Sequence, residues 1–67
     1  MRLNELADND HALISGVNDT RLQNLGIVPN KIVKVLRRNA TCLHIQIGLT
    51  EWIIRKDYAE SVNIIPR

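Results

Sequence analysis

The chain of 67 residues has no phenylalanine, and its single cysteine excludes a disulfide within the chain. The paired Cys/His spacings of structural zinc sites are also absent. No segment approaches the roughly 20 apolar residues of a membrane-spanning helix, and the N-terminus lacks the apolar core of a signal peptide. We therefore expect one small cytoplasmic domain, residues 1–67, without direct insertion into a membrane and with a core of aliphatic side chains.

Sequence signatures of catalysis are missing as well. The chain has two histidines and one cysteine, with no visible base beside a nucleophile. It contains no Gly-rich phosphate loop and no pair of carboxylates at a helical or strand spacing. We predict that the protein is not an enzyme and that it uses no cofactor.

Positive charge is concentrated in the segment from Lys31 to Arg38, which contains no acidic residue. Basic strands of small barrels can follow a phosphate backbone, so nucleic-acid binding through this segment is one hypothesis. Against it, single-stranded sites usually stack bases on aromatic rings, and this segment has none. A solvated face is the favoured interpretation, followed by a site for an acidic protein partner. The four basic residues are Lys31, Lys34, Arg37 and Arg38.

A short helix and a sharp turn are predicted in the middle of the chain. Asn18, Asp19 and Thr20 are typical N-cap residues for a helix over Thr20 to Leu25, and Asp19 would lie at its positive end. Gly26 stands where a left-handed C-cap is needed, and Pro29 prevents the helix from resuming. Asn30 tolerates the positive φ of the turn that follows Pro29.

Five strands are predicted around this helix, with single helical turns at Leu3 to Leu6 and Lys56 to Glu60. Alternation in the third strand predicts a buried face of Leu43, Ile45, Ile47 and Leu49. Short strands with one helix fit a small SH3-like barrel, because closure protects strand edges, and we expect the helix to plug one end. The strands are His11 to Val17, Lys31 to Arg38, Leu43 to Leu49, Trp52 to Arg55 after a turn near Leu49 to Glu51, and Val62 to Ile65.

The helix, the turn and the strand after them resemble the ferrous iron transport protein A (FeoA) family. The likeness covers almost the whole chain, and three features depart from the family pattern. Asn30 and Leu49 stand where the family favours glycine, and the loop from Asn39 to Cys42 is shorter. The residues that define the resemblance are Arg21, Leu22, Leu25, Gly26, Ile27 and Pro29, followed by Val33, Val35, Leu36, Arg37 and Arg38.

This resemblance implies a small bacterial SH3-like domain that has no chemistry of its own. Such a domain works at the inner face of the membrane, beside a ferrous iron transporter with a cytoplasmic guanine-nucleotide-binding domain. The same fold occurs as the C-terminal domain of metal-responsive repressors of the diphtheria toxin repressor type. The residues expected to contact the transporter are Arg21, Leu22, Leu25, Gly26, Ile27, Pro29, Lys34, Arg37 and Arg38.

The apolar helix residues and the Cys42 and His44 pair each have a purely structural interpretation beside a functional one. Helical spacing is first a sign of burial, so we expect the core to contain Leu22, Leu25 and Ile27, although a docking surface is the alternative. Cys42 and His44 lie on one face of a strand and supply at most two metal ligands, whereas a transition metal needs three or four. We favour an ordinary surface pair over a metal site completed by a second copy of the chain. An exposed strand edge could also pair two copies weakly.

Overall fold

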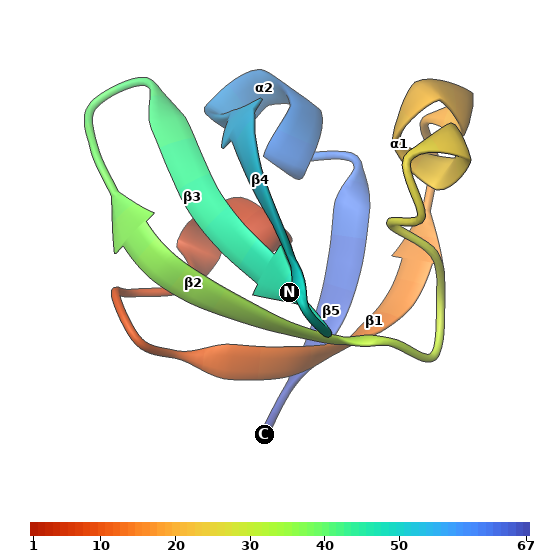
Figure 1. Cartoon of the computed structure of the whole chain (residues 1–67), viewed down its shortest axis with the longest axis horizontal. Helices are drawn as coiled ribbons and strands as arrows, with labels where there is room; N and C mark the ends of the chain where they lie inside the picture. Colours follow the sequence, from red (N-terminus) through yellow and green to blue (C-terminus); the bar gives the residue numbers. More distant parts are fainter.

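The computed structural model describes all 67 residues as a single, strongly curved antiparallel sheet with short helices at its open side (Figure 1). The strand order is β4-β3-β2-β1-β5, so β4 and β5 form the two edges. This arrangement confirms the predicted five-stranded fold. The elements are η1 (Leu3–Glu5), β1 (His11–Val17), α1 (Thr20–Asn24), β2 (Ile32–Arg38), β3 (Cys42–Ile47), β4 (Thr50–Arg55), α2 (Lys56–Ala59) and β5 (Val62–Pro66).

Every buried residue is aliphatic, as the scarcity of aromatic residues predicts. Inward-facing residues of the strands meet Leu3 and Leu6 from the N-terminal segment and Leu22 from α1. Trp52 and Tyr58, the two aromatic residues, are half-buried against this aliphatic core. The core consists of Leu3, Leu6, Ala12, Ile14, Val17, Leu22, Ile27, Val33, Val35, Leu43, Ile45, Ile54, Ala59, Val62 and Ile64.

The turn after α1 has the predicted backbone geometry. Gly26 has φ of 95° and Asn30 has φ of 71°, so both occupy the left-handed region. The helix itself ends at Asn24, one residue earlier than expected, with Leu25 as its C-cap. The N–H of Ile27 donates to the carbonyl oxygen of Leu22 at 3.1 Å, which satisfies one of the last carbonyls of the helix.

The prediction that Leu49 lies on the buried face of the third strand was wrong. The third strand ends at Ile47, and Gly48 and Leu49 form a two-residue hairpin turn to β4. Gly48 has φ of 61°, which suits the first central position of a type II′ turn. The Leu49 side chain is therefore 100% exposed instead of continuing the buried face.

A bulge explains the irregular alternation of the first strand. The pairing of β1 with β5 shifts register between Ile14 and Gly16. One extra residue on a strand moves the following side chains to the opposite face. Ile14 and Val17 are consequently both buried, although they lie three residues apart.

The two edges of the sheet are finished differently. At β5, the N–H of Ile64 donates to the carbonyl oxygen of Met1 at 2.8 Å, and Arg2 forms an isolated bridge with Asn63. Leu3, directly after these residues, is buried in the core. The outer edge of β4 has no strand or bridge beside it.

Candidate functional site: an apolar groove beside strand β4

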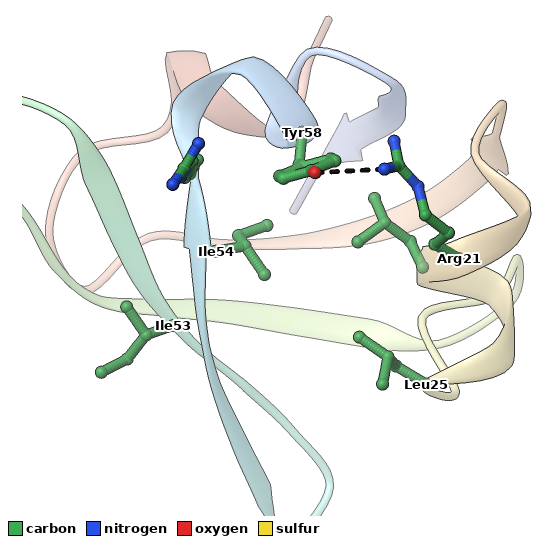
Figure 2. A pocket seen from close by; sticks show the side chains of 7 residues that line it. Arg21, Leu25, Ile53, Ile54 and Tyr58 are labelled. Atoms are coloured by element: carbon green, nitrogen blue, oxygen red, sulfur yellow. Dashed lines mark hydrogen bonds between the residues drawn. The ribbon is translucent and has the colours of Figure 1, made fainter.

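A groove of about 320 Å³ lies where β4 faces α1 and α2. Figure 2 shows its walls: Leu25 and Arg21 approach from α1, Ile54 from β4, and Tyr58 from α2. Five of the seven lining residues are hydrophobic, and both charged ones are arginines. The full lining is Arg21, Leu22, Leu25, Ile53, Ile54, Arg55 and Tyr58.

The apolar part of the groove has a buried floor and an exposed rim. Leu22 and Ile54 belong to the core and form the floor. On the rim, Leu25 is 45% exposed and Ile53 is 73% exposed. Exposed aliphatic residues gathered around a groove are typical of an interaction site, whereas single exposed ones are ordinary.

Arg21 and Tyr58 close one end of the groove. Nη1 of Arg21 donates to the Tyr58 hydroxyl at 3.2 Å, and the guanidinium carbon lies 4.7 Å from the centre of the ring (Figure 2). The Arg21 side chain also donates to Asp19 at 3.0 and 3.2 Å. This hydrogen bonding lowers the pKa of Asp19 and raises the pKa of Arg21. Both groups therefore remain charged at neutral pH.

Hydrogen bonds at its first turn and the burial of Leu22 hold α1 in place as a wall of the groove. The Asp19 carboxylate accepts the backbone N–H of Arg21 at 2.8 Å, which makes Asp19 the N-cap among the three candidates in the sequence. At the next turn, the side-chain amide of Gln23 donates to the carbonyl oxygen of Val17 at 2.8 Å. A helix of five residues is too short to be stable alone, so these contacts and the burial of Leu22 position it.

The predicted partner residues of the helix and turn fall into two groups. Leu22 and Ile27 are buried, as the core interpretation predicted, but Leu25 is half-exposed and that interpretation was wrong for it. The reason is the end of the helix: Leu25 is its cap residue and projects over the groove. Gly26 and Pro29 shape the turn beyond the helix and do not line the groove.

The basic strand does not contribute to the groove. Lys34 and Arg37 pair with Gln46 and His44 on β3, away from the buried valines of the same strand. Arg38 is used internally: its Nη1 donates to the carbonyl oxygen of Leu6 at 2.7 Å. The strand therefore does not present its charges as one continuous stripe.

Cys42 and His44 are both half-buried on β3. Nε2 of His44 lies 2.8 Å from Oε1 of Glu51 on the neighbouring strand. No group of three or more Cys, His, Asp or Glu side chains comes together in the structure. A metal site at Cys42 and His44 would need ligands from outside the chain.

Four groove residues were not predicted as site residues: Ile53, Ile54, Arg55 and Tyr58. Tyr58 lies 37 residues from Arg21 in the sequence, so their contact depends on how the helices pack. A signal was present for Ile53, because alternation along a strand puts the side chain of this large aliphatic residue on the opposite face from those of Trp52 and Ile54. Its exposure on the outer face is the feature that marks the site.

Comparison with known proteins identifies relatives of the whole chain. The family model of the FeoA domain matches residues 1–66. The structure is similar to the crystal structure of an iron uptake regulatory protein (FeoA), with a TM-score of 0.91, 19% identity and coverage of 100% of this chain and 97% of that one. No curated protein sequence matches this chain significantly.

A second similar structure is FeoA from Stenotrophomonas maltophilia in complex with zinc, described as a prokaryotic SH3 domain protein. Its TM-score is 0.89 at 26% identity, over 97% of this chain and 89% of that one. A manganese-dependent transcriptional repressor gives a TM-score of 0.89 at 16% identity, over 98% of this chain and 40% of that one. These structures confirm the SH3-like fold, which the repressor contains as one part of a longer chain.

Proposed function

The chain belongs to the FeoA domain family, and we propose that it is a cytoplasmic accessory protein of ferrous iron uptake. In this proposal it contacts the cytoplasmic part of the membrane ferrous iron transporter, performs no catalysis and holds no cofactor. The observation that supports it most directly is the family match over residues 1–66. The S. maltophilia relative is itself described as a candidate activating factor of ferrous iron transport.

The groove beside β4 is the surface that we assign to this contact. Its rim exposes Leu25 and Ile53, and aliphatic residues of this kind usually form the centre of a protein interface. Arg21 adds a planar cation, a residue type enriched in interfaces. None of the helices in the structure has the length and apolar character of a membrane span.

An uptake assay with two matched leucine variants tests this proposal. Cells that lack the chain receive the wild type, Leu25→Asp or Leu49→Asp, and the initial rate of radioactive ferrous iron uptake is measured. Both leucines are exposed, but only Leu25 lines the groove. We expect Leu25→Asp to lower the rate severalfold, because an aspartate would bury an unpaired charge in the contact. Leu49→Asp should retain the wild-type rate.

Folding is checked by circular dichroism on both purified variants. Uptake that is equal for the two variants, with both folded, would contradict a role for the groove. Co-purification of the tagged chain with the ferrous transporter from gently solubilised membranes is the complementary test. Loss of the transporter in Leu25→Asp, with retention in Leu49→Asp, is the expected result.

A further inference from the structure

The outer edge of β4 offers backbone hydrogen-bonding groups that the molecule itself does not use. The N–H of Lys56 donates to the carbonyl oxygen of Thr41 at 2.9 Å, which makes this pair a hydrogen-bonded position of the ladder. Such positions alternate with non-hydrogen-bonded ones in an antiparallel pair. Ile54 therefore bonds to β3, whereas the N–H and C=O groups of Ile53 and Glu51 point outward.

This free edge is continuous with the apolar groove. Ile53 and Ile54 line the groove from the same strand, one on the rim and one on the floor. Figure 2 shows α1 standing across from β4, with Leu25 and Ile54 on the two sides of the space between them. An extended segment laid along β4 would place alternate side chains over Ile54, toward Leu22. The groove therefore suits a strand with aliphatic side chains on one face.

The charges at the groove favour an acidic segment. The charge of Arg21 is already paired with that of Asp19, whose Oδ2 lies 3.0 Å from Nη2 of Arg21. Arg55 is different, because it lines the groove and has no acidic side chain within 4.0 Å. Arg55 follows Ile54 along β4, so the two side chains lie on opposite faces of the strand. A partner side chain opposite Arg55 therefore lies on the outer face of the added strand. A carboxylate at that position would form a cross-strand ion pair.

We infer that the groove and the edge of β4 together bind an extended segment of a protein partner by strand addition. The segment alternates aliphatic residues, which enter the groove, with acidic residues, one of which meets Arg55. Backbone hydrogen bonds to Ile53 and Glu51 supply the register. The inference rests on the proposed function only in assigning this segment to the cytoplasmic part of the ferrous transporter.

A peptide titration tests the inference on the full chain. The probe is a blocked hexapeptide, Thr-Glu-Leu-Glu-Val-Thr, added at millimolar concentration to isotope-labelled protein and followed by amide NMR shifts and amide hydrogen exchange. We expect shifted and protected N–H groups at Glu51 and Ile53, with no change at Ile64, whose N–H points outward on the far edge. The same peptide with glutamine in place of both glutamates should bind about fivefold more weakly, which corresponds to one exposed ion pair at the upper end of its usual strength.

Two peptides with N-methyl groups separate strand addition from simple filling of the groove. One is methylated at both glutamates, and the other at leucine and valine. Only alternate residues of an added strand direct their N–H groups to the neighbouring strand, so one peptide should lose binding and the other should keep it. Equal binding by the two peptides, or shifts without amide protection at β4, would overturn the inference.

A variant of the protein provides the matching test. Ile53→Pro removes one outward N–H but no bond of the β3-β4 ladder, a position where proline is tolerated at a sheet edge. Its control, Ile53→Val, keeps the N–H. Peptide binding should be lost in the proline variant and kept in the valine variant. If the proline variant does not fold, the methylated peptides still decide the question.

The outcomes also separate this inference from the proposed function. Uptake that depends on Leu25, with no peptide effect on the β4 amides, would leave the accessory role intact and overturn strand addition. Peptide addition to β4, with uptake unaffected by Leu25→Asp, would support strand addition and contradict the role of the groove in iron uptake.

Discussion

The two edges of this sheet have the same backbone chemistry but different surroundings. At β5, the N-terminal residues supply a hydrogen bond to Ile64, and Leu3 anchors this segment in the core. At β4, the edge stands beside a groove with Leu25 and Ile53 on its rim. Exposed edges invite pairing with other chains, and natural proteins usually cover or charge them. Because the β5 edge is covered and the β4 edge is not, the β4 side of the domain is the one open to pairing with another chain.

The largest expected effect tests the covered edge. Leu3→Ala removes a side chain that is 0% exposed and should lower the free energy of unfolding by about 2–5 kcal/mol. A domain of this length has a total stability of only about 3–10 kcal/mol, so much of it would be lost. Leu25→Ala on the groove rim should cost at most about 1 kcal/mol, because half of that side chain is already in solvent.

Urea unfolding followed by circular dichroism measures both leucine variants. Equal costs would show that the N-terminal segment does not anchor the β5 edge as described. The two edges would then not differ as proposed, because Leu3 would contribute no more to stability than the half-exposed Leu25.

A medium effect is expected at the turn that positions the groove wall. Gly26→Ala forces an alanine to φ near 95°, where a Cβ is unfavourable by about 1–2 kcal/mol. An added Cβ would meet no atom within 4 Å, so the cost isolates the backbone conformation. Gly16→Ala is the control: its Cβ would lie 3.8 Å from the Asn63 side chain, an ordinary contact. That variant should change stability by no more than about 0.5 kcal/mol.

Thermal and urea unfolding of the two glycine variants would decide this prediction. A Gly26→Ala protein as stable as the wild type would contradict the assigned backbone geometry, and with it the position of α1 against the groove.

The smallest effect concerns charge at the end of the groove. The hydrogen bond from Arg21 lowers the pKa of the Asp19 carboxyl in the folded protein. A depressed pKa contributes stability above the ordinary carboxyl value of about 3.9, and this contribution is lost as the pH falls through the folded value. Asp19→Asn keeps the N-cap acceptor and removes the charge. The variant should be slightly less stable at pH 7, and the difference should disappear in acid.

Unfolding midpoints across this pH range, at low and at high salt, measure the effect of the Asp19 charge. A difference that persists below the folded pKa would mean that the carboxylate acts through geometry and not through its charge. Screening by salt should also reduce the difference at neutral pH, since the Arg21 side chain is largely exposed.

Local signals in the sequence were sufficient for the fold but not for the site. Gly26 and Asn30 have backbone requirements that few other residues meet, so the turn after α1 was predictable. Leu49 was placed in the third strand because alternation alone cannot tell the end of a strand from its continuation. The strand ends at Ile47, and the positive φ of Gly48 begins the turn. The contact of Arg21 with Tyr58 joins two helices through the packing of the whole sheet. Nothing local in the sequence specifies such a contact.

Leu22 and Leu25 differ in burial, and this difference also could not be predicted from the local sequence. Their spacing places both on one helix face, which predicts burial for both. The helix ends at Asn24, however, and the core beneath it is filled by Leu22 and Ile27. The second leucine is left over the groove, where it faces Ile54 (Figure 2). Periodicity indicates which face is apolar, but only the packed structure shows how much of it is covered.

The most direct test compares the two edges in the presence of the proposed partner. Amide hydrogen exchange is measured on the full chain alone and with the purified cytoplasmic domain of the ferrous transporter. We expect new protection at Glu51 and Ile53 on β4, with the β5 edge unchanged. Protection confined to β5, or no change at either edge while the two proteins bind, would contradict this expectation.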